Sequence, residues 1–169
     1  MQLAEKYKML SVEDLKEKMN VFVTSEKMVN ELVFHAHQFA KHIQTGRRIH
    51  LYGAAFPLAL SLSFAEDACV LGYPVYFHQG FENCETLKSQ DGVHALITFS
   101  GRWIESAYDA CATISRCHER FFLITSSDRT LPNVMEKIRL PRLCSNEYMN
   151  VLYLLFLDLV LLELLRLAG

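Results

Sequence analysis

Short apolar runs that alternate with helix-like segments constrain the fold of this chain more than any other feature. The runs are continuously apolar, which is the pattern of strands that are covered on both faces. Strands that alternate with helices over brief connections build βαβ units with right-handed crossovers and a parallel sheet. The sequence therefore predicts an α/β fold, with strands over residues 49–52, 75–77, 95–99, 121–125 and 138–140.

Helical periodicity fills the segments around these strands. A long amphipathic helix is predicted over residues 26–44, where apolar side chains recur at spacings of three and four, and Gly46 is its expected stop. A capping box formed by Ser11 and Asp14 opens a shorter helix that continues to Met19. Further helices are predicted over residues 57–71, 103–117, 131–136 and 145–167, with a partial helix over 81–88.

The composition fits one well-packed domain and argues against nucleic acid as a direct partner. The chain has 169 residues, of which 51% are hydrophobic and 21% charged, so it is long enough to bury a sizeable core. Its net charge of −2 provides no basic surface of the kind that binds DNA. Five dispersed cysteines without a CxxC motif, and no signal peptide, indicate a reduced cytoplasmic protein. We expect no disulfide framework, no metal site and no cofactor.

The C-terminal segment 151–168 is the one stretch whose apolarity approaches that of a membrane span. Asp158, Glu163 and Arg166 interrupt it, and charges are costly inside a bilayer. A helix that is apolar nearly all round is more often buried between layers or subunits. We therefore expect a buried helix here and no contact with a membrane.

Three polar loops follow predicted strands, at residues 53–57, 98–101 and 125–128. Ligands of open α/β sheets bind outside the carboxyl ends of the strands, and all three loops lie at that edge. In the second loop, Ser100 offers a hydroxyl and Gly101 lets the backbone approach a ligand closely. The same residues also suit an ordinary helix cap. Together the three loops favour a small anionic ligand over a dinucleotide, since the full GxGxxG pattern is missing.

This arrangement resembles the SIS (sugar isomerase) domain, and specifically the sugar-phosphate-sensing half of RpiR-type transcriptional regulators. The resemblance covers residues 26–168 and rests on the segments GRRIHLYG, CVLGYPVYF, ALITFSG and FFLITSSD. It implies a three-layer αβα sandwich of flavodoxin-like type with a five-stranded parallel sheet, assembled as a homodimer or homotetramer. We accordingly place the SIS domain at residues 26–169 and an N-terminal arm with a short helix at residues 1–25.

The family's two phosphate-binding loops are only partly retained. The first typically reads Gly-x-Gly-x-Ser, and here Ala55 and Pro57 take the second glycine and the serine. The second typically reads Ser-x-Ser-Gly-x-Thr, and here Thr98 keeps a hydroxyl whereas Trp103 replaces the threonine. Arg102 either compensates through a charge-assisted contact or is a solvated surface residue. The resemblance implies a ligand site made of Gly53, Ala55, Thr98, Ser100, Gly101, Arg102, Trp103, Thr125 and Ser126.

The resemblance leaves three functions open. We favour a non-enzymatic domain that senses a sugar phosphate. The second is an aldose–ketose sugar-phosphate isomerase, for which Glu147 and His78 are the candidate catalytic residues. The third is a degenerate scaffold that only mediates oligomerisation. The RpiR-type resemblance also implies a helix-turn-helix domain, but residues 1–45 supply only about two helices, so contact with DNA would require a domain absent from this chain.

Overall fold

A single sheet of five parallel strands forms the centre of the molecule. The computed structural model describes residues 5, 7–80 and 91–169. The strands β1 (Ile49–Gly53), β2 (Val75–Gln79), β3 (Val93–Ile97), β4 (Phe121–Thr125) and β5 (Glu136–Arg139) lie in the order β2-β1-β3-β4-β5. Strands β1, β3 and β4 are buried along their whole length, as continuous apolar runs require. The predicted α/β fold with a five-stranded parallel sheet is confirmed.

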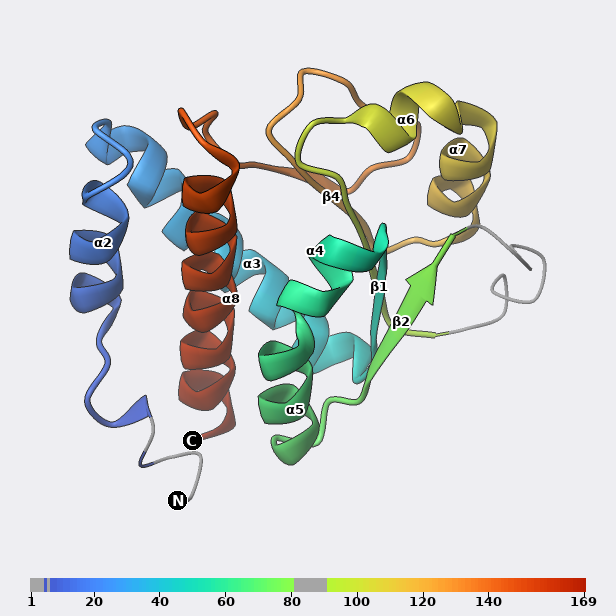
Figure 1. Ribbon diagram of the computed structural model, residues 1–169. Coiled ribbons are helices and arrows are strands. Elements are labelled where there is room, and N and C mark those ends of the chain that lie inside the picture. The colour runs from blue at the N-terminus through green and yellow to red at the C-terminus, as the bar shows by residue number, and fades with distance from the viewer. Residues whose placement is uncertain (1–4, 6, 81–90) are drawn as a thin grey trace.

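Helices α2 (Val12–Asn20), α3 (Glu26–Gly46), α5 (Leu62–Val70) and α8 (Asn146–Ala168) cover one face of the sheet (Figure 1). This face carries the larger core, in which strand side chains such as Leu51, Ala95 and Phe122 meet the helices. Helix α8 contacts α2, α3 and α5, so most of its apolar side chains are buried against other helices of the same chain. Among the described residues, no helix combines the length and apolarity needed to cross a lipid bilayer.

The opposite face carries a smaller core under α6 (Arg102–Ser106) and α7 (Tyr108–Cys117). Successive side chains along a strand point to opposite faces of the sheet. Leu96 and Leu123 therefore belong to this core, whereas the residues before and after each of them in the sequence belong to the larger one. Figure 1 shows both helices on the side of the sheet away from α3 and α8. The three layers are therefore helices, sheet and helices.

The predicted capping box is confirmed, but the end of α3 differs from the prediction. The Ser11 hydroxyl accepts from the Asp14 N–H at 3.1 Å, and the Asp14 carboxylate accepts from the Ser11 N–H at 2.9 Å. Gly46 does not stop α3, because the left-handed C-cap is Arg47 with φ of 64°. Gly46 is needed for close packing instead: a Cβ there would lie 3.2 Å from the backbone of Gly92.

Two predicted helices are each divided in the structure. The segment 57–71 forms α4 (Ala55–Leu60) and α5, which are separated at Ser61. The buried Ser61 hydroxyl bonds to the Pro57 carbonyl at 2.9 Å and to the Tyr153 hydroxyl at 2.8 Å, which holds the junction against α8. The segment 103–117 is divided at Ala107, whose φ of −140° and ψ of 44° are not helical.

The helix predicted over residues 131–136 is wrong. These residues form turns that lead directly into β5, and Asn133 has a left-handed φ of 55°. Its side-chain amide donates to the carbonyls of Ser115 and His118 at 3.0 and 3.2 Å, so a contact with the end of α7 fixes this turn. Strand β3 also begins and ends two residues before its predicted bounds of 95–99. The partial helix predicted over 81–88 lies outside the described residues.

Candidate ligand-binding site

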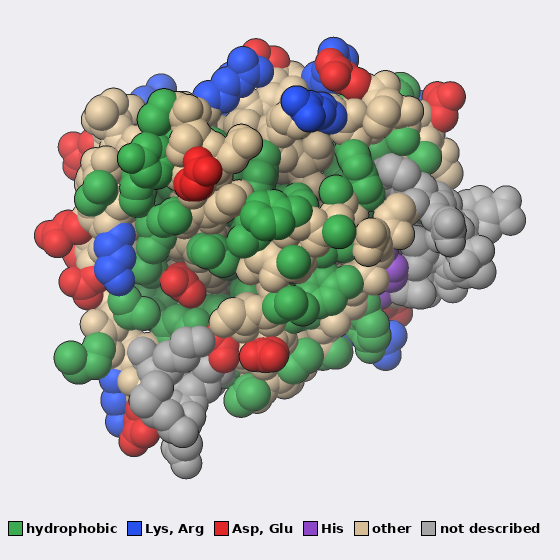
Figure 2. Space-filling view, viewed as in Figure 1, with side chains coloured by type: hydrophobic (Ala, Val, Ile, Leu, Met, Phe, Trp, Pro, Cys, Tyr) green, Lys and Arg blue, Asp and Glu red, His purple; other side chains and the backbone are tan. Residues whose placement is uncertain are grey.

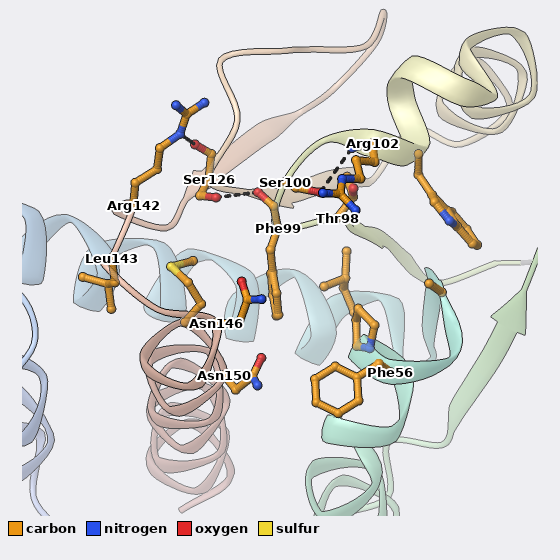
Figure 3. A pocket seen from close by; sticks show the side chains of 15 residues that line it. Phe56, Thr98, Phe99, Ser100, Arg102, Ser126, Arg142, Leu143, Asn146 and Asn150 are labelled. Carbon is orange, nitrogen blue, oxygen red and sulfur yellow. Dashed lines mark hydrogen bonds between the residues drawn. The ribbon is translucent and has the colours of Figure 1, made fainter.

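A pocket of about 630 Å³ opens at the carboxyl ends of the strands (Figure 3). The chain passes from β1 outward to β2 and then returns to β3 beside β1, so the order of strands reverses between β1 and β3. Such a reversal separates the loops that follow the two strands and leaves a crevice between them. The pocket lies in this crevice, lined by residues from the segments 54–57, 97–103 and 142–150 and by Ser126.

The loop after β3 is fastened to the loop after β4 by backbone contacts. The Thr98 N–H donates to the Ile124 carbonyl at 3.0 Å, and the Ser126 N–H donates to the Phe99 carbonyl at 2.9 Å. Gly101 has a left-handed φ of 75°, and a Cβ on it would lie 2.6 Å from Ser127 Oγ. Glycine is therefore required at this position both for its backbone conformation and for its lack of a side chain.

Hydroxyl groups line the inner part of the pocket. Thr98 and Ser126 are buried, and the Ser126 hydroxyl also donates to the Phe99 carbonyl. Ser100 is exposed, and its Oγ accepts from the Arg102 N–H at 3.4 Å. Ser100 therefore supports the start of α6 while it remains open to the pocket.

Two arginines make the pocket electropositive. Arg102 and Arg142 are the charged residues among its described lining, and no lining residue is acidic. The Arg142 Nε–H donates to the Ser126 carbonyl at 3.2 Å, which anchors this side chain to the loop after β4. Figure 3 shows the two arginines on opposite sides of the Phe99 side chain. The arrangement suits an anionic ligand.

The residues predicted for the site divide into two groups. Those that line the pocket are Thr98, Ser100, Arg102, Trp103 and Ser126. The others, Gly53, Ala55, Gly101 and Thr125, lie in the same strand ends and loops without lining it. Thr125 is fully buried, and its Oγ1 accepts from the Ser127 N–H at 3.0 Å, so its hydroxyl shapes the loop.

The two candidate catalytic residues lie away from the pocket lining. His78 belongs to β2, and its Nε2 lies 2.9 Å from His50 Nδ1. Glu147 is exposed in the first turn of α8, where hydrogen bonds from its own backbone N–H and from the Ser145 side chain lower its pKa. This environment is typical of a carboxylate at a helix N-terminus.

Polar residues from the last connection and from α8 were missed by the sequence-based prediction. Arg142 precedes the helix, and Asn146 and Asn150 lie one turn apart at its start. Figure 3 shows both amides beside Phe99 and across the pocket from Phe56. Their position after the fifth strand is a signal that could have found them, because that connection begins at the same edge of the sheet.

Comparison with solved structures finds neighbours of low sequence identity, among them the following three. A hypothetical protein from Methanococcus jannaschii, for which a 3-hexulose-6-phosphate isomerase function was inferred, has a TM-score of 0.62 at 20% identity, covering 92% of this chain and 87% of that one. Vibrio vulnificus NanR, complexed with ManNAc-6P, has a TM-score of 0.59 at 11% identity and covers 96% of this chain. A putative sugar-binding protein from Salmonella typhimurium LT2 has a TM-score of 0.55 at 16% identity and covers 82%.

This chain spans 65% of the NanR chain and 45% of the Salmonella chain. No protein-family model and no curated protein matches the sequence. The likenesses therefore concern the fold. The fold of this chain is that of a SIS domain.

Proposed function

We propose that this chain is a SIS domain that binds a sugar phosphate and senses it without converting it. The pocket carries this proposal, because it combines two arginines with hydroxyl and amide side chains and has no acidic lining residue among those described. A phosphate prefers charge-assisted bonds from arginine, and a sugar offers hydroxyls to neutral polar groups. The ManNAc-6P complex of NanR, a protein of the same fold, supports a ligand of this class.

The lining also argues for binding over isomerisation. An aldose–ketose isomerase needs a base within hydrogen-bond reach of the protons at C1 and C2 of the sugar. The described lining contains no Asp, Glu, His, Lys, Tyr or Cys side chain. Glu147 and His78, the two candidates for such a base, lie outside it.

The size of the pocket argues against a scaffold that has lost its ligand. Phe56 and Trp103 do line it, but a cavity of about 630 Å³ remains beside them. Pockets for small molecules measure roughly 300–1,000 Å³. A monosaccharide phosphate fits within this space.

We propose that copies of the chain associate through the face that carries α8, α4 and α5. Figure 2 shows apolar side chains gathered on this face, and Tyr148, Val151, Leu154, Phe56 and Leu62 are exposed there. The first turn of α8 lines the pocket, so a ligand that shifts this turn would change how the copies pack. Such a coupling is what an effector domain of an RpiR-type regulator needs, with DNA bound by a separate domain.

Calorimetric titration with hexose 6-phosphates and amino-sugar phosphates tests the binding proposal. We expect Arg102→Ala to weaken binding roughly ten- to hundredfold, because a hydrogen bond to a charged group contributes about 1.5–3 kcal/mol. Arg116→Ala, an exposed arginine on α7 away from the pocket, is the matched control and should bind like the wild type. Absence of binding to the whole panel at millimolar concentration would refute sensing.

Two further measurements separate the alternatives. A coupled isomerase assay that shows turnover, abolished by Glu147→Gln, would replace sensing with catalysis. Light scattering of the wild type and of Leu154→Lys tests the association, and we expect the variant to be monomeric.

A further inference from the structure

Four histidines meet on the face of the sheet that α6 and α7 cover, outside the described lining of the pocket. His50 lies on β1, His78 on β2 and His94 on β3, while His118 directly follows α7. The ladder places His50 beside Tyr76 on one side and beside His94 on the other. Since parallel partners share a face, the strand register brings these rings together.

The rings form one continuous stack across the sheet. Ring centroids are 5.0 Å apart between Tyr76 and His50, 4.5 Å between His50 and His94, and 3.4 Å between His94 and His118. The corresponding planes are inclined by 16°, 6° and 10°. We call this group, together with His78, the histidine stack.

Hydrogen bonds connect the histidine stack between neighbouring strands, from β1 to β2 and from β1 to β3. His50 Nδ1 and His78 Nε2 are 2.9 Å apart, and the Tyr52 hydroxyl lies 2.9 Å from His94 Nδ1. The His50–His78 contact requires one nitrogen to donate and the other to accept. A proton on both nitrogens would remove this bond.

Edge strand β2 depends on these contacts more than the central strands do. In the described sheet it pairs with β1 alone, and its residues are exposed or half-buried. Its rings reach β1 through Tyr76 against His50 and through His78 against both His50 and Tyr52. These ring contacts supplement the backbone ladder that holds the strand.

We propose that the histidine stack is a proton-sensitive clasp, and that proton uptake by its imidazoles in mildly acidic solution releases β2 from the sheet.

The charges that act on His50 and His118 are positive, and among the described groups only a hydrogen bond with the Asp91 backbone favours a proton on His50. His50, His94 and His118 are at most 5% exposed, and His118 Nε2 has no hydrogen-bond partner in the described part of the chain. The groups that face the histidine stack are Arg48 and Tyr52 from β1 and its approach, Tyr76 from β2, the Asp91 backbone before β3, and Cys111 of α7 beside Tyr52. Arg48 adds a positive charge that disfavours a proton on His50.

The direction of the titration follows from this burial. Desolvation by burial, and then the neighbouring charge of a protonated His78, lower the pKa values of His50 and His118 to about 4. Burial also lowers the pKa of His78 itself. An imidazole released into water regains a pKa near 6.5, so the open form binds more protons below that pH. The clasp is closed above about pH 6.5 and weakens as the pH falls toward 4.

Protons are favoured over a metal ion as the ligand of this cluster. In the described ranges, no three His, Cys, Asp or Glu side chains are placed to hold a metal ion. Parallel stacked rings direct their nitrogens past one another, whereas metal ligands must converge on one point.

Hydrogen exchange between pH 7.5 and 5.5, read by mass spectrometry and corrected for intrinsic rates, tests the clasp. We expect the β2 amides to lose protection relative to α8, with an opening equilibrium that rises up to about tenfold per pH unit for each proton taken up. His50→Phe keeps a stacking ring without a titratable nitrogen and should flatten this dependence. His78→Gln, at a half-buried site, keeps a hydrogen-bonding group but removes a titratable imidazole. It replaces His50→Phe in the test if that variant does not fold, and it should also flatten the pH dependence.

His42→Gln is the matched control. His42 lies on α3, across the sheet, with its ring 5.4 Å from that of Phe122, and burial lowers its pKa as well. It should leave the pH dependence of β2 unchanged. Constant protection of β2 in the wild type, parallel loosening of β2 and α8, or an equal effect of His42→Gln would each overturn the proposal. None of these outcomes depends on whether the pocket binds a sugar phosphate.

Discussion

Gly101 lies so close to Ser127 that a Cβ on the glycine would come within 2.6 Å of the serine Oγ. The serine cannot easily move away, because it is buried and its Oγ accepts from the Arg129 N–H at 3.2 Å. The loop after β3 and the loop after β4 thus fit together only with glycine at this position. Pocket shape depends directly on this contact, since Ser100 and Arg102 flank the glycine.

Gly101→Ala should destabilise the protein by roughly 2 kcal/mol or more and weaken ligand binding. A left-handed backbone costs a non-glycine residue about 1–2 kcal/mol, and the clash with Ser127 adds to this cost. Urea denaturation measures the loss. Gly72→Ala is the control, because Gly72 has a φ of 88° and open space around its Cβ position. This variant should be destabilised only by the cost of the left-handed backbone, without a steric clash. Adding Ser127→Gly should restore part of the stability, and an unchanged deficit would contradict the steric explanation.

Ser61→Ala should cost about 1–3 kcal/mol by leaving a buried phenol unpaired. The Ser61 hydroxyl has one hydrogen, which it donates to the Pro57 carbonyl, so the Tyr153 hydroxyl is the donor in their mutual bond. Tyr153 is fully buried, and a lone buried donor carries its whole desolvation penalty. A double-mutant cycle with Tyr153→Phe measures the coupling. The double variant should be destabilised by less than the sum of the single changes, and strict additivity would show that the bond contributes nothing.

Asn146→Asp should separate ligand affinity from stability. The new carboxylate would stand in the first turn of α8, where the helix dipole favours it by about 0.3–1 kcal/mol. It would also face the pocket and repel an anion, which should lower sugar-phosphate affinity about five- to tenfold. Thermal unfolding and calorimetry report the two effects. Glu147→Gln, which changes the neighbouring first-turn charge outside the pocket, should leave affinity nearly unchanged.

Glu163→Gln should lower stability at neutral pH by about 1–3 kcal/mol, with a loss that disappears in acid. Burial alone would raise the Glu163 pKa, but hydrogen bonds with His37 at 2.7 Å and Arg166 at 2.9 Å outweigh burial and hold this pKa below its usual 4.5. A lowered folded-state pKa stabilises the protein fully above the unfolded value and progressively less as the pH falls through the folded one.

Urea denaturation of wild type and variant at a series of pH values from 7 downward checks this prediction. The difference between them should be full above about pH 4.5 and should shrink below it. Glu31→Gln is the control, since its pair with Lys27 is exposed and spans 3.9 Å. It should change stability little at any pH. A Glu163 effect that is independent of pH would point to lost packing instead of lost charge.

The sheet could be predicted from the sequence because its signal is local. Each central strand is a short and mainly apolar run between helices, which is the pattern of a strand that is buried on both faces. The capping box at Ser11 was equally local, since both of its partners lie within one helical turn. Features set by distant contacts escaped the prediction. The break at Ser61 depends on Tyr153, and the turn at Asn133 depends on carbonyls at the end of α7.

The part of the candidate site that directly follows strands could be predicted from the sequence, and the rest could not. Thr98, Ser100, Arg102 and Ser126 come directly after β3 or β4, so the rule that ligands bind at strand ends found them. Arg142, Asn146 and Asn150 reach the pocket only because α8 crosses the larger core and begins above it. The histidine stack also escaped the prediction, because its members are separated by up to 68 positions and meet only through the strand register and the end of α7.

The central position of α8 has a consequence for biosynthesis. All five strands and α3 leave the ribosome before this helix does, yet α3 and the larger core have no cover on that side until it arrives. The nascent chain therefore carries an open apolar surface until α8 has been synthesised, which is the state that chaperones bind and that aggregates when they are scarce. Synthesis of α8 covers the core, and its first turns also complete the wall of the pocket, so a nascent chain cannot form the whole pocket before the start of α8 has emerged.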